Sequence, residues 1–162
     1  MVLGDRKRTG IRYLMVIVLL LFASLVTMLP FRIVLVNGSS MYPSFKARSL
    51  VLLSLSDNDY RPNDVVVLRG NDGSIYMKRL IAEGLSTVNI SEQFITVDGK
   101  PMDDPYAYYG AIKRSNTVPE GTFQVPEGSW FVMGDNRFNS FDSRYAQFGT
   151  IKEKSIIGKV IF

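Results

Sequence analysis

Apolar residues follow two different patterns along the chain. Between Tyr13 and Phe31 no charged residue occurs, and such a run would measure about 28 Å as a helix, close to the thickness of the hydrocarbon layer of a bilayer. After residue 33 the apolar residues form short runs rich in β-branched and aromatic residues, with Gly, Asn, Asp and Pro clustered between them. The pattern predicts one helix followed by a β domain.

The uninterrupted run at 13–31 predicts a transmembrane helix, and Pro30 near its end can stop that helix. The alternatives are a cleavable signal peptide and a buried soluble helix. The run is longer than a signal h-region, no Ala-x-Ala site follows it, and no polar face interrupts it. Positive charges precede it at Arg6, Lys7, Arg8 and Arg12, and only Arg32 follows closely. The positive-inside bias therefore predicts a single-pass protein of the cell membrane, with residues 1–12 cytoplasmic and residues 32–162 outside.

The second pattern predicts a domain that is mainly β, with an antiparallel sheet. The predicted strands lie at 33–36, 50–55, 64–70, 74–82, 94–97 and 129–134, with a last one near 156–162. Asn71-Asp72-Gly73 and Asp98-Gly99 are tight-turn signals, because Asp-Gly tolerates the positive φ that hairpins need. Residues 101–128 are poor in strand signals and are predicted to be a long excursion.

Two absences narrow the chemistry. The chain contains no cysteine, which excludes disulfides and thiolate chemistry, and no histidine, which excludes Ser-His-Asp and Cys-His catalysis. A zinc site is disfavoured for the same reason, and no metal or cofactor is expected. The net charge of +4 is partly concentrated near the start of the chain, and no basic-aromatic motif occurs, so no nucleic-acid partner is predicted.

Three segments carry candidate chemistry. The first is the Ser-rich turn at 37–44, which contains Ser40. The second is Lys78 in an apolar strand, where alternation places either Lys78 or Arg79 on a face shared with apolar neighbours. A buried lysine loses its charge more easily and can take a proton from a serine, although a solvated lysine on an edge strand is the simpler alternative. The third is the polar loop at 134–144, which by itself fits an ordinary structural turn.

These segments occur in the same order in the bacterial type I signal peptidases, and the chain resembles that family (peptidase family S26, with a Ser-Lys dyad), in its short Gram-positive-like form. Ser-Met-Tyr-Pro at 40–43 resembles the nucleophile box, and Tyr-Met-Lys-Arg at 76–79 resembles the general-base box. Gly-Asp-Asn-Arg-x-Asn-Ser-x-Asp-Ser-Arg at 134–144 resembles the last box, and Phe148-Gly149 and Ile157-Gly158-Lys159 also match.

The resemblance implies a role for each matching residue. Ser40 would be the nucleophile, Lys78 the general base, and Ser140 the residue that orients the lysine amine. The Ser40 amide would form half of the oxyanion hole, and at Gly38 a backbone group or a water would have to supply the rest. The remaining expected residues are Asp142 and Arg144 as a supporting ion pair, and Met41, Met77 and Met133 as lining of shallow substrate pockets, for which ordinary core packing is the alternative.

The implied function is a membrane-bound endopeptidase that removes signal peptides from exported preproteins. Its partners would be preproteins bound as an extended strand, the lipid bilayer and possible contacts with the secretion machinery. Phe138 departs from the family pattern, which commonly has aspartate there. The alternatives are a peptidase dedicated to one pilin or conjugation substrate, a non-catalytic pilus-assembly factor, and a Ser-Lys self-cleaving repressor.

Overall fold

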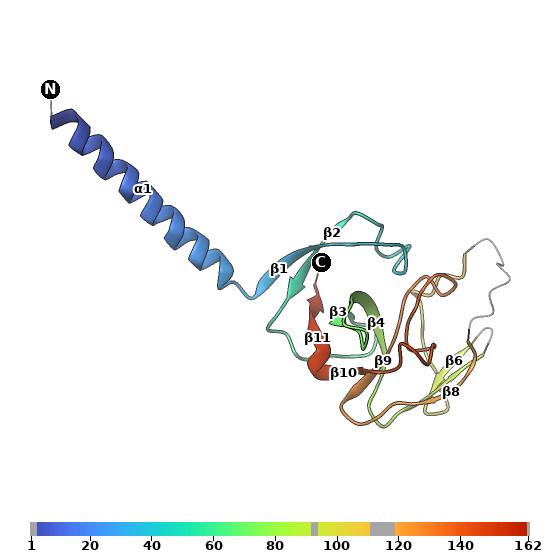
Figure 1. Ribbon diagram of the computed structural model, residues 1–162. Helices are drawn as coiled ribbons and strands as arrows, with labels where there is room; N and C mark the ends of the chain where they lie inside the picture. The colour runs from blue at the N-terminus through green and yellow to red at the C-terminus, as the bar shows by residue number, and fades with distance from the viewer. Residues whose placement is uncertain (1–2, 92–93, 111–118, 162) are drawn as a thin grey trace. The chain divides into compact units, whose positions relative to one another are not determined.

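The computed structural model describes residues 3–91, 94–110 and 119–161, and the chain forms two units, Met1–Pro30 and Phe31–Phe162 (Figure 1). The first unit contains helix α1 (Leu3–Thr27), which begins before the predicted segment 13–31 and ends short of Pro30. Proline disfavours helical geometry in the residue before it, and Phe31 already belongs to a strand. No helix in the described ranges reaches the combined length and apolarity required of a membrane span.

The second unit is built from strands. They are β1 (Phe31–Leu35), β2 (Leu50–Ser54), β3 (Val65–Arg69), β4 (Ile75–Glu83), β5 (Thr87–Ile90), β6 (Ile95–Val97), β7 (Lys100–Pro101), β8 (Gly121–Gln124), β9 (Ser129–Met133), β10 (Ile151–Lys152) and β11 (Ile156–Val160), with a 3-10 turn at Glu153–Ser155. Within the described ranges one sheet has the order β1-β2-β11-β3-β4-β9-β10 and the other β7-β6-β5-β8. Each pair of neighbouring strands is antiparallel, which confirms the prediction that this unit is mainly β and antiparallel.

Both predicted tight turns are present. The β3–β4 hairpin closes through Asn71-Asp72-Gly73, with Gly73 at φ 83° and the Gly70 amide donating to the Ser74 carbonyl at 2.8 Å. Asp98 and Gly99 have φ of 53° and 76° and join β6 to β7. Positive φ at these positions is the conformation that the Asp-Gly signals predicted.

Strands β5, β7, β8 and β10 were not predicted, and the proposed excursion at 101–128 needs correction. It contains β8, which pairs with β5 in the smaller sheet, and residues 111–118 of it lie outside the described residues. β5 and β8 read Thr-Val-Asn-Ile and Gly-Thr-Phe-Gln, so each has too few apolar residues to produce a strand signal of its own. Pairing between segments distant in sequence stabilises them instead.

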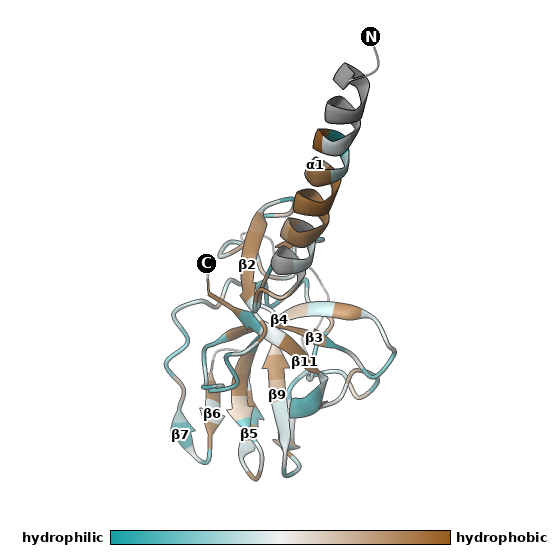
Figure 2. Ribbon diagram, turned by 90° about the vertical axis from the view of Figure 1, so that its left-hand side faces the viewer, coloured by the Kyte–Doolittle hydropathy of each residue, from teal (hydrophilic) through white to brown (hydrophobic). Residues whose placement is uncertain are grey.

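Strands β4 and β9 connect the two hydrophobic cores of the unit. Their side chains alternate, so Ile81 and Phe131 enter one cluster with residues of the smaller sheet, while Leu80 and Trp130 enter the other. In Figure 2, which is coloured by hydropathy, brown marks the apolar residues of these strands. β4 is thereby buried on both faces over most of its length, and any polar side chain that it carries there needs an internal partner.

We expect Phe131→Ala to destabilise the protein by about 3–5 kcal/mol. Phe131 is fully buried in β9, and its ring lies 5.1 Å from that of Phe123 in β8, so truncation leaves a cavity where the two sheets meet. Urea unfolding followed by circular dichroism measures the change. Phe94→Ala is the control, because Phe94 is 67% exposed and its truncation should change stability by less than about 0.5 kcal/mol. Equal effects of the two variants would contradict this account of the core.

Candidate active site

Strand β4 carries two adjacent basic residues, and both are buried. Lys78 is 2% exposed and Arg79 is 4% exposed, on opposite faces of the strand. The sequence required only one of the pair to share a face with apolar neighbours. The structure encloses both, but by different means, because Arg79 has a carboxylate partner, whereas Lys78 has a hydroxyl.

The Lys78 amine donates a hydrogen bond to Ser140 Oγ at 2.9 Å, and Ser140 is itself buried. The amine also lies 5.7 Å from the centre of the Tyr76 ring. The pKa of Lys78 is lowered from 10.5 to about 8, and burial is the main cause; Asp142 and Asp135 act to raise it, and Arg144 acts to lower it. A substantial fraction of the amine is therefore neutral just above neutral pH.

Ser40 lies in the turn that follows β1, and the polar loop at 134–144 holds this turn in place. The Asn136 amide donates to the Ser40 carbonyl at 2.9 Å. The Asn139 side chain donates to Ser39 Oγ at 2.8 Å, and that of Asn136 donates to the Ser39 carbonyl at 3.2 Å. Ser40 is half-buried, and Gly38 before it has φ of 86°, which favours glycine. The turn is thus fixed by contacts with a segment about a hundred residues away in sequence.

Gly134 is the point at which the Ser40 turn and Ser140, the hydrogen-bond partner of Lys78, meet. A Cβ atom placed on Gly134 would overlap Ser140 Oγ, Ser140 Cβ and the Ser40 carbonyl oxygen. Both serines therefore lie directly against this glycine, and Lys78 reaches the same place through Ser140. Among the described contacts, no hydrogen bond joins Ser40 Oγ to Lys78 Nζ. Such bonds often tighten only when a substrate is bound.

Asp142 and Arg144 form a fully buried ion pair behind this meeting point. Arg144 Nε lies 2.7 Å from Asp142 Oδ1, and the second pair of atoms is 2.8 Å apart. Asp142 Oδ2 also accepts from the Gly134 amide at 2.9 Å, and Arg144 donates to the Arg137 carbonyl at 2.8 Å. The pair thereby fixes the backbone on both sides of the loop that carries Ser140.

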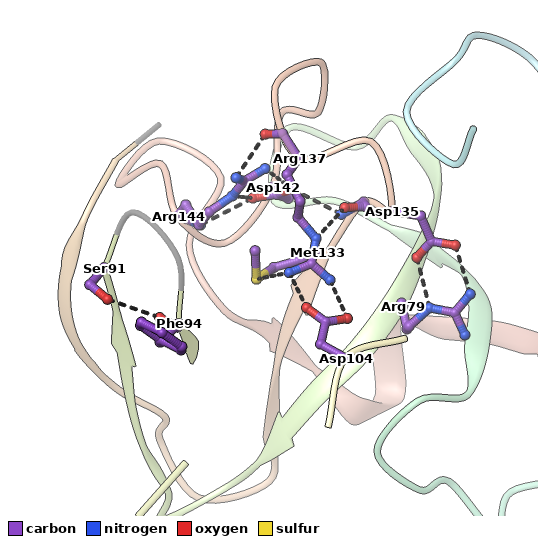
Figure 3. Close-up of polar contacts among 10 residues, drawn as sticks. Arg79, Ser91, Phe94, Asp104, Met133, Asp135, Arg137, Asp142 and Arg144 are labelled. Carbon is purple, nitrogen blue, oxygen red and sulfur yellow. Dashed lines mark hydrogen bonds and ion pairs between the residues drawn. The ribbon is translucent and has the colours of Figure 1, made fainter. Parts of the chain in front are cut away.

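Two further ion pairs were missed by sequence reasoning, and Figure 3 shows both. Arg79 binds both carboxylate oxygens of Asp135 at 2.7 Å, and Arg137 binds Asp104 at 2.6 and 2.8 Å. The number of arginines and aspartates in the loop was a signal that internal pairs exist. No sequence signal pointed to Asp104, which lies about thirty residues earlier in the supposed excursion.

The remaining expected residues fall into two groups. Met41 and Met133 are each 1% exposed, so packing accounts for their side chains, whereas Met77 is half-buried; pocket lining remains a prediction for all three. Phe138, where the family commonly has aspartate, packs edge-on against Tyr109 at 5.7 Å. No group of acidic, histidine or cysteine side chains that could hold a metal occurs in the part of the chain that the structure describes.

Comparisons with known proteins agree with this geometry. A family model described as "Signal peptidase, peptidase S26" matches residues 9–162. Signal peptidase I T of Bacillus subtilis (strain 168) is 34% identical over 152 residues, which covers 88% of this chain and 78% of the relative. Signal peptidase IB of Staphylococcus aureus (strain N315) is 33% identical over 143 residues, with 78% and 74% covered. A crystal structure of a signal peptidase I from Enterococcus faecalis V583 matches with a TM-score of 0.55 and 29% identity, over 62% of this chain and 96% of that one.

These matches show that the protein is a serine protease, a class of hydrolase. More narrowly, the chain belongs to the signal peptidase family, peptidase S26, as the sequence motifs predicted. Its substrates are accordingly preproteins that carry signal peptides, and its reaction is the removal of the signal peptide.

We expect Gly134→Ala to lower the cleavage rate by about 100-fold or more, because the new methyl group forces Ser140 and the Ser40 carbonyl apart. Cleavage of a preprotein under single-turnover conditions measures the effect. Gly158→Ala is a matched control, since its Cβ would overlap the Ser54 carbonyl and Leu53 between β11 and β2 instead. That variant should lose thermal stability and retain the wild-type rate. An active Gly134→Ala enzyme would contradict the convergence of the two serines on Gly134.

Proposed function

We propose that Ser40 is the nucleophile and Lys78 the general base of this signal peptidase. The single observation that carries the proposal is the buried Lys78 amine, held by Ser140 at 2.9 Å beside the glycine that Ser40 also contacts. A neutral amine in this position can accept a proton from a hydroxyl, which makes it an activator for a serine nucleophile in a chain without histidine.

In the proposed reaction Lys78 Nζ takes the proton of Ser40 Oγ as the oxygen attacks the carbonyl carbon of the scissile bond. The tetrahedral intermediate collapses when the C–N bond breaks, and the Lys78 ammonium gives its proton to the leaving amine. Water then attacks the acyl-enzyme while the same amine takes its proton. The ester C–O bond breaks, Ser40 Oγ takes the proton back from the ammonium, and the signal peptide leaves with a new carboxylate. Ser140 holds the amine in line through both steps.

The negative oxygen of the tetrahedral intermediate needs hydrogen-bond donors. Among the described residues none accepts a hydrogen bond from the Ser40 amide, which leaves this N–H for the substrate. A side chain at position 38 would meet nothing within 4 Å, so the space beside Gly38 is open on this side. We therefore assign the Ser40 amide as one donor, with a backbone group or a water near Gly38 as the second.

The buried lysine also argues against a purely structural role for the domain. An ammonium group without a carboxylate partner destabilises a folded protein, and replacing it with an apolar residue would cost a scaffold nothing. In the described part of the chain, Lys78 has no ion-pair partner, whereas the neighbouring Arg79 has one. Retention of such a residue is expected of an enzyme that uses the neutral amine.

The membrane anchor and the substrate's conformation are part of the same proposal. The run 13–31 without a charged residue, with basic residues before it, supports insertion of this segment into the bilayer with residues 32–162 outside the cytoplasm. A preprotein would bind there as an extended strand, with small residues such as alanine at the first and third positions before the cut. Its own apolar segment would lie in the same bilayer, so anchoring brings enzyme and substrate together, close to the secretion machinery.

We expect Lys78→Met and Ser40→Ala each to lower cleavage of a model preprotein by about 1,000-fold or more, since each removes one half of the dyad. Methionine fits the apolar surroundings of Lys78, so the fold should persist. The assay uses the full chain in detergent, with cleavage followed by electrophoresis and the fold by circular dichroism. Substantial cleavage by a folded, purified Lys78→Met protein would eliminate this residue as the base.

The ionisation of the Lys78 amine should make both the cleavage rate and the stability of the protein depend on pH. Cleavage should rise with pH through about 8 and level off above it, because only the neutral amine accepts a proton. Stability should change as well. Below pH 8 the amine is charged in both the folded and the unfolded state, and between 8 and 10.5 only the unfolded state stays protonated, so unfolding becomes harder as pH rises.

The lowering of the pKa from 10.5 to about 8 corresponds to about 3 kcal/mol. The stability of the wild-type protein should therefore gain about that amount relative to Lys78→Met between these pH values, which urea titrations of the two proteins can measure. A cleavage rate that does not vary between pH 6 and 9 would be incompatible with Lys78 as the base.

A further inference from the structure

The segment 104–109, from Asp104 to Tyr109, contacts each of the three chain segments that carry the proposed site residues. It is called here the tyrosine strap, because Tyr106, Tyr108 and Tyr109 provide most of its side-chain contacts. It lies in the region that the sequence predicted to be an excursion, and neither the family motifs nor the proposed reaction assigns it a role.

The strap first contacts the loop that carries Ser140. The Tyr108 amide donates to the Asp135 carbonyl at 2.8 Å, and the Tyr108 carbonyl accepts from the Arg137 amide at 2.9 Å. These bonds form a short parallel bridge with the loop at Asn136. Arg137, whose side chain is almost fully buried, adds its ion pair with Asp104, visible in Figure 3. Backbone and side chain thus fasten the strap to the same loop.

The strap also contacts the two other catalytic segments. The ring of Tyr108 packs edge-on against that of Tyr42 at 5.2 Å, two residues after Ser40. The ring of Tyr106 lies 3.7 Å from the guanidinium carbon of Arg79, next to Lys78 in β4. Such ring contacts are favourable and directional, so they help to select one arrangement of the segments that they join.

We propose that the tyrosine strap positions Ser40 relative to Lys78, with Tyr108 as the main positioning residue. The proposal rests on the proposed function of Ser40 and Lys78 and adds the group that holds them. Ser40 lies in a turn, and turns deviate more easily than strands, so its distance from a lysine fixed in β4 depends on what restrains the turn. Asn136 restrains it through the Ser40 carbonyl, and the Tyr108 ring restrains it through Tyr42.

The main experiment compares Tyr108→Ala with Tyr108→Phe in the full-length protein. Loss of the ring should lower kcat for a model preprotein by about 10- to 100-fold while KM changes by less than about threefold, because misplacement of the nucleophile affects the chemical step. Phenylalanine keeps the ring and the backbone bonds, so Tyr108→Phe should restore kcat to within about twofold of the wild type.

Tyr60→Ala is the control for lost stability. Tyr60 is half-buried like Tyr108 but packs against the core cluster of Leu68 and Trp130. Its truncation should lower Tm by a similar amount and leave kcat unchanged. Equal losses of kcat in Tyr60→Ala and Tyr108→Ala, or a Tyr108→Ala effect confined to KM, would overturn the positioning role.

A second pair of variants keeps the proposal testable if Tyr108→Ala does not fold. Asp104→Asn removes the charge that Arg137 binds, and Asp103→Asn removes the same charge from the exposed neighbouring side chain. We expect kcat to fall by about tenfold in the first and to stay at the wild-type value in the second. Cleavage of the preprotein by the wild type but not by Ser40→Ala tests the proposed function separately. If that test succeeds and kcat is unchanged in Asp104→Asn, the positioning role of the strap is refuted while the proposed function stands.

Discussion

The structure depends on the enclosure of one amine by apolar strands. Lys78 is 2% exposed, and its hydrogen-bond partner is a hydroxyl group rather than a carboxylate. A carboxylate in contact would have stabilised the ammonium form and kept its pKa high. With Ser140 in that place, desolvation is the dominant effect and the pKa falls to about 8. The neighbourhood of the amine is therefore arranged to keep charge at a distance, with Asp142 and Asp135 both paired to arginines.

Those arginine–aspartate pairs explain how the site can be rigid although no carboxylate among the described residues is paired with the Lys78 amine. Asp142 binds Arg144 and the Gly134 amide, and these bonds hold the loop on which Ser140 lies. Gly134 in turn has no side chain, which lets Ser140 and the Ser40 carbonyl both approach it. The charged residues therefore hold the backbone around the site, while the amine itself is hydrogen-bonded to a hydroxyl and lies 5.7 Å from the centre of an aromatic ring.

β4 connects this site to the rest of the domain. Its two faces enter two separate cores, and its two basic residues use these faces differently. Lys78 faces Ser140, whereas Arg79 faces Asp135 and the Tyr106 ring. A strand that is packed on both sides moves little, so it is the fixed reference against which the Ser40 turn and the 134–144 loop are placed. The tyrosine strap belongs to this arrangement, because it contacts the reference strand and both loops.

The sequence alone determined the parts of this protein that depend on local chemistry. The run without charge at 13–31, the Asp-Gly turns and the boxes around Ser40, Lys78 and 134–144 are patterns of adjacent residues, and the lack of histidine left lysine as the most economical base. Tertiary structure decided what depends on segments far apart in the chain. The pairing of β5 with β8, the ion pair of Asp104 with Arg137 and the convergence of two serines on Gly134 each join residues that no local pattern connects. Burial, too, is a property of the folded chain, and it is burial that lowers the pKa of Lys78.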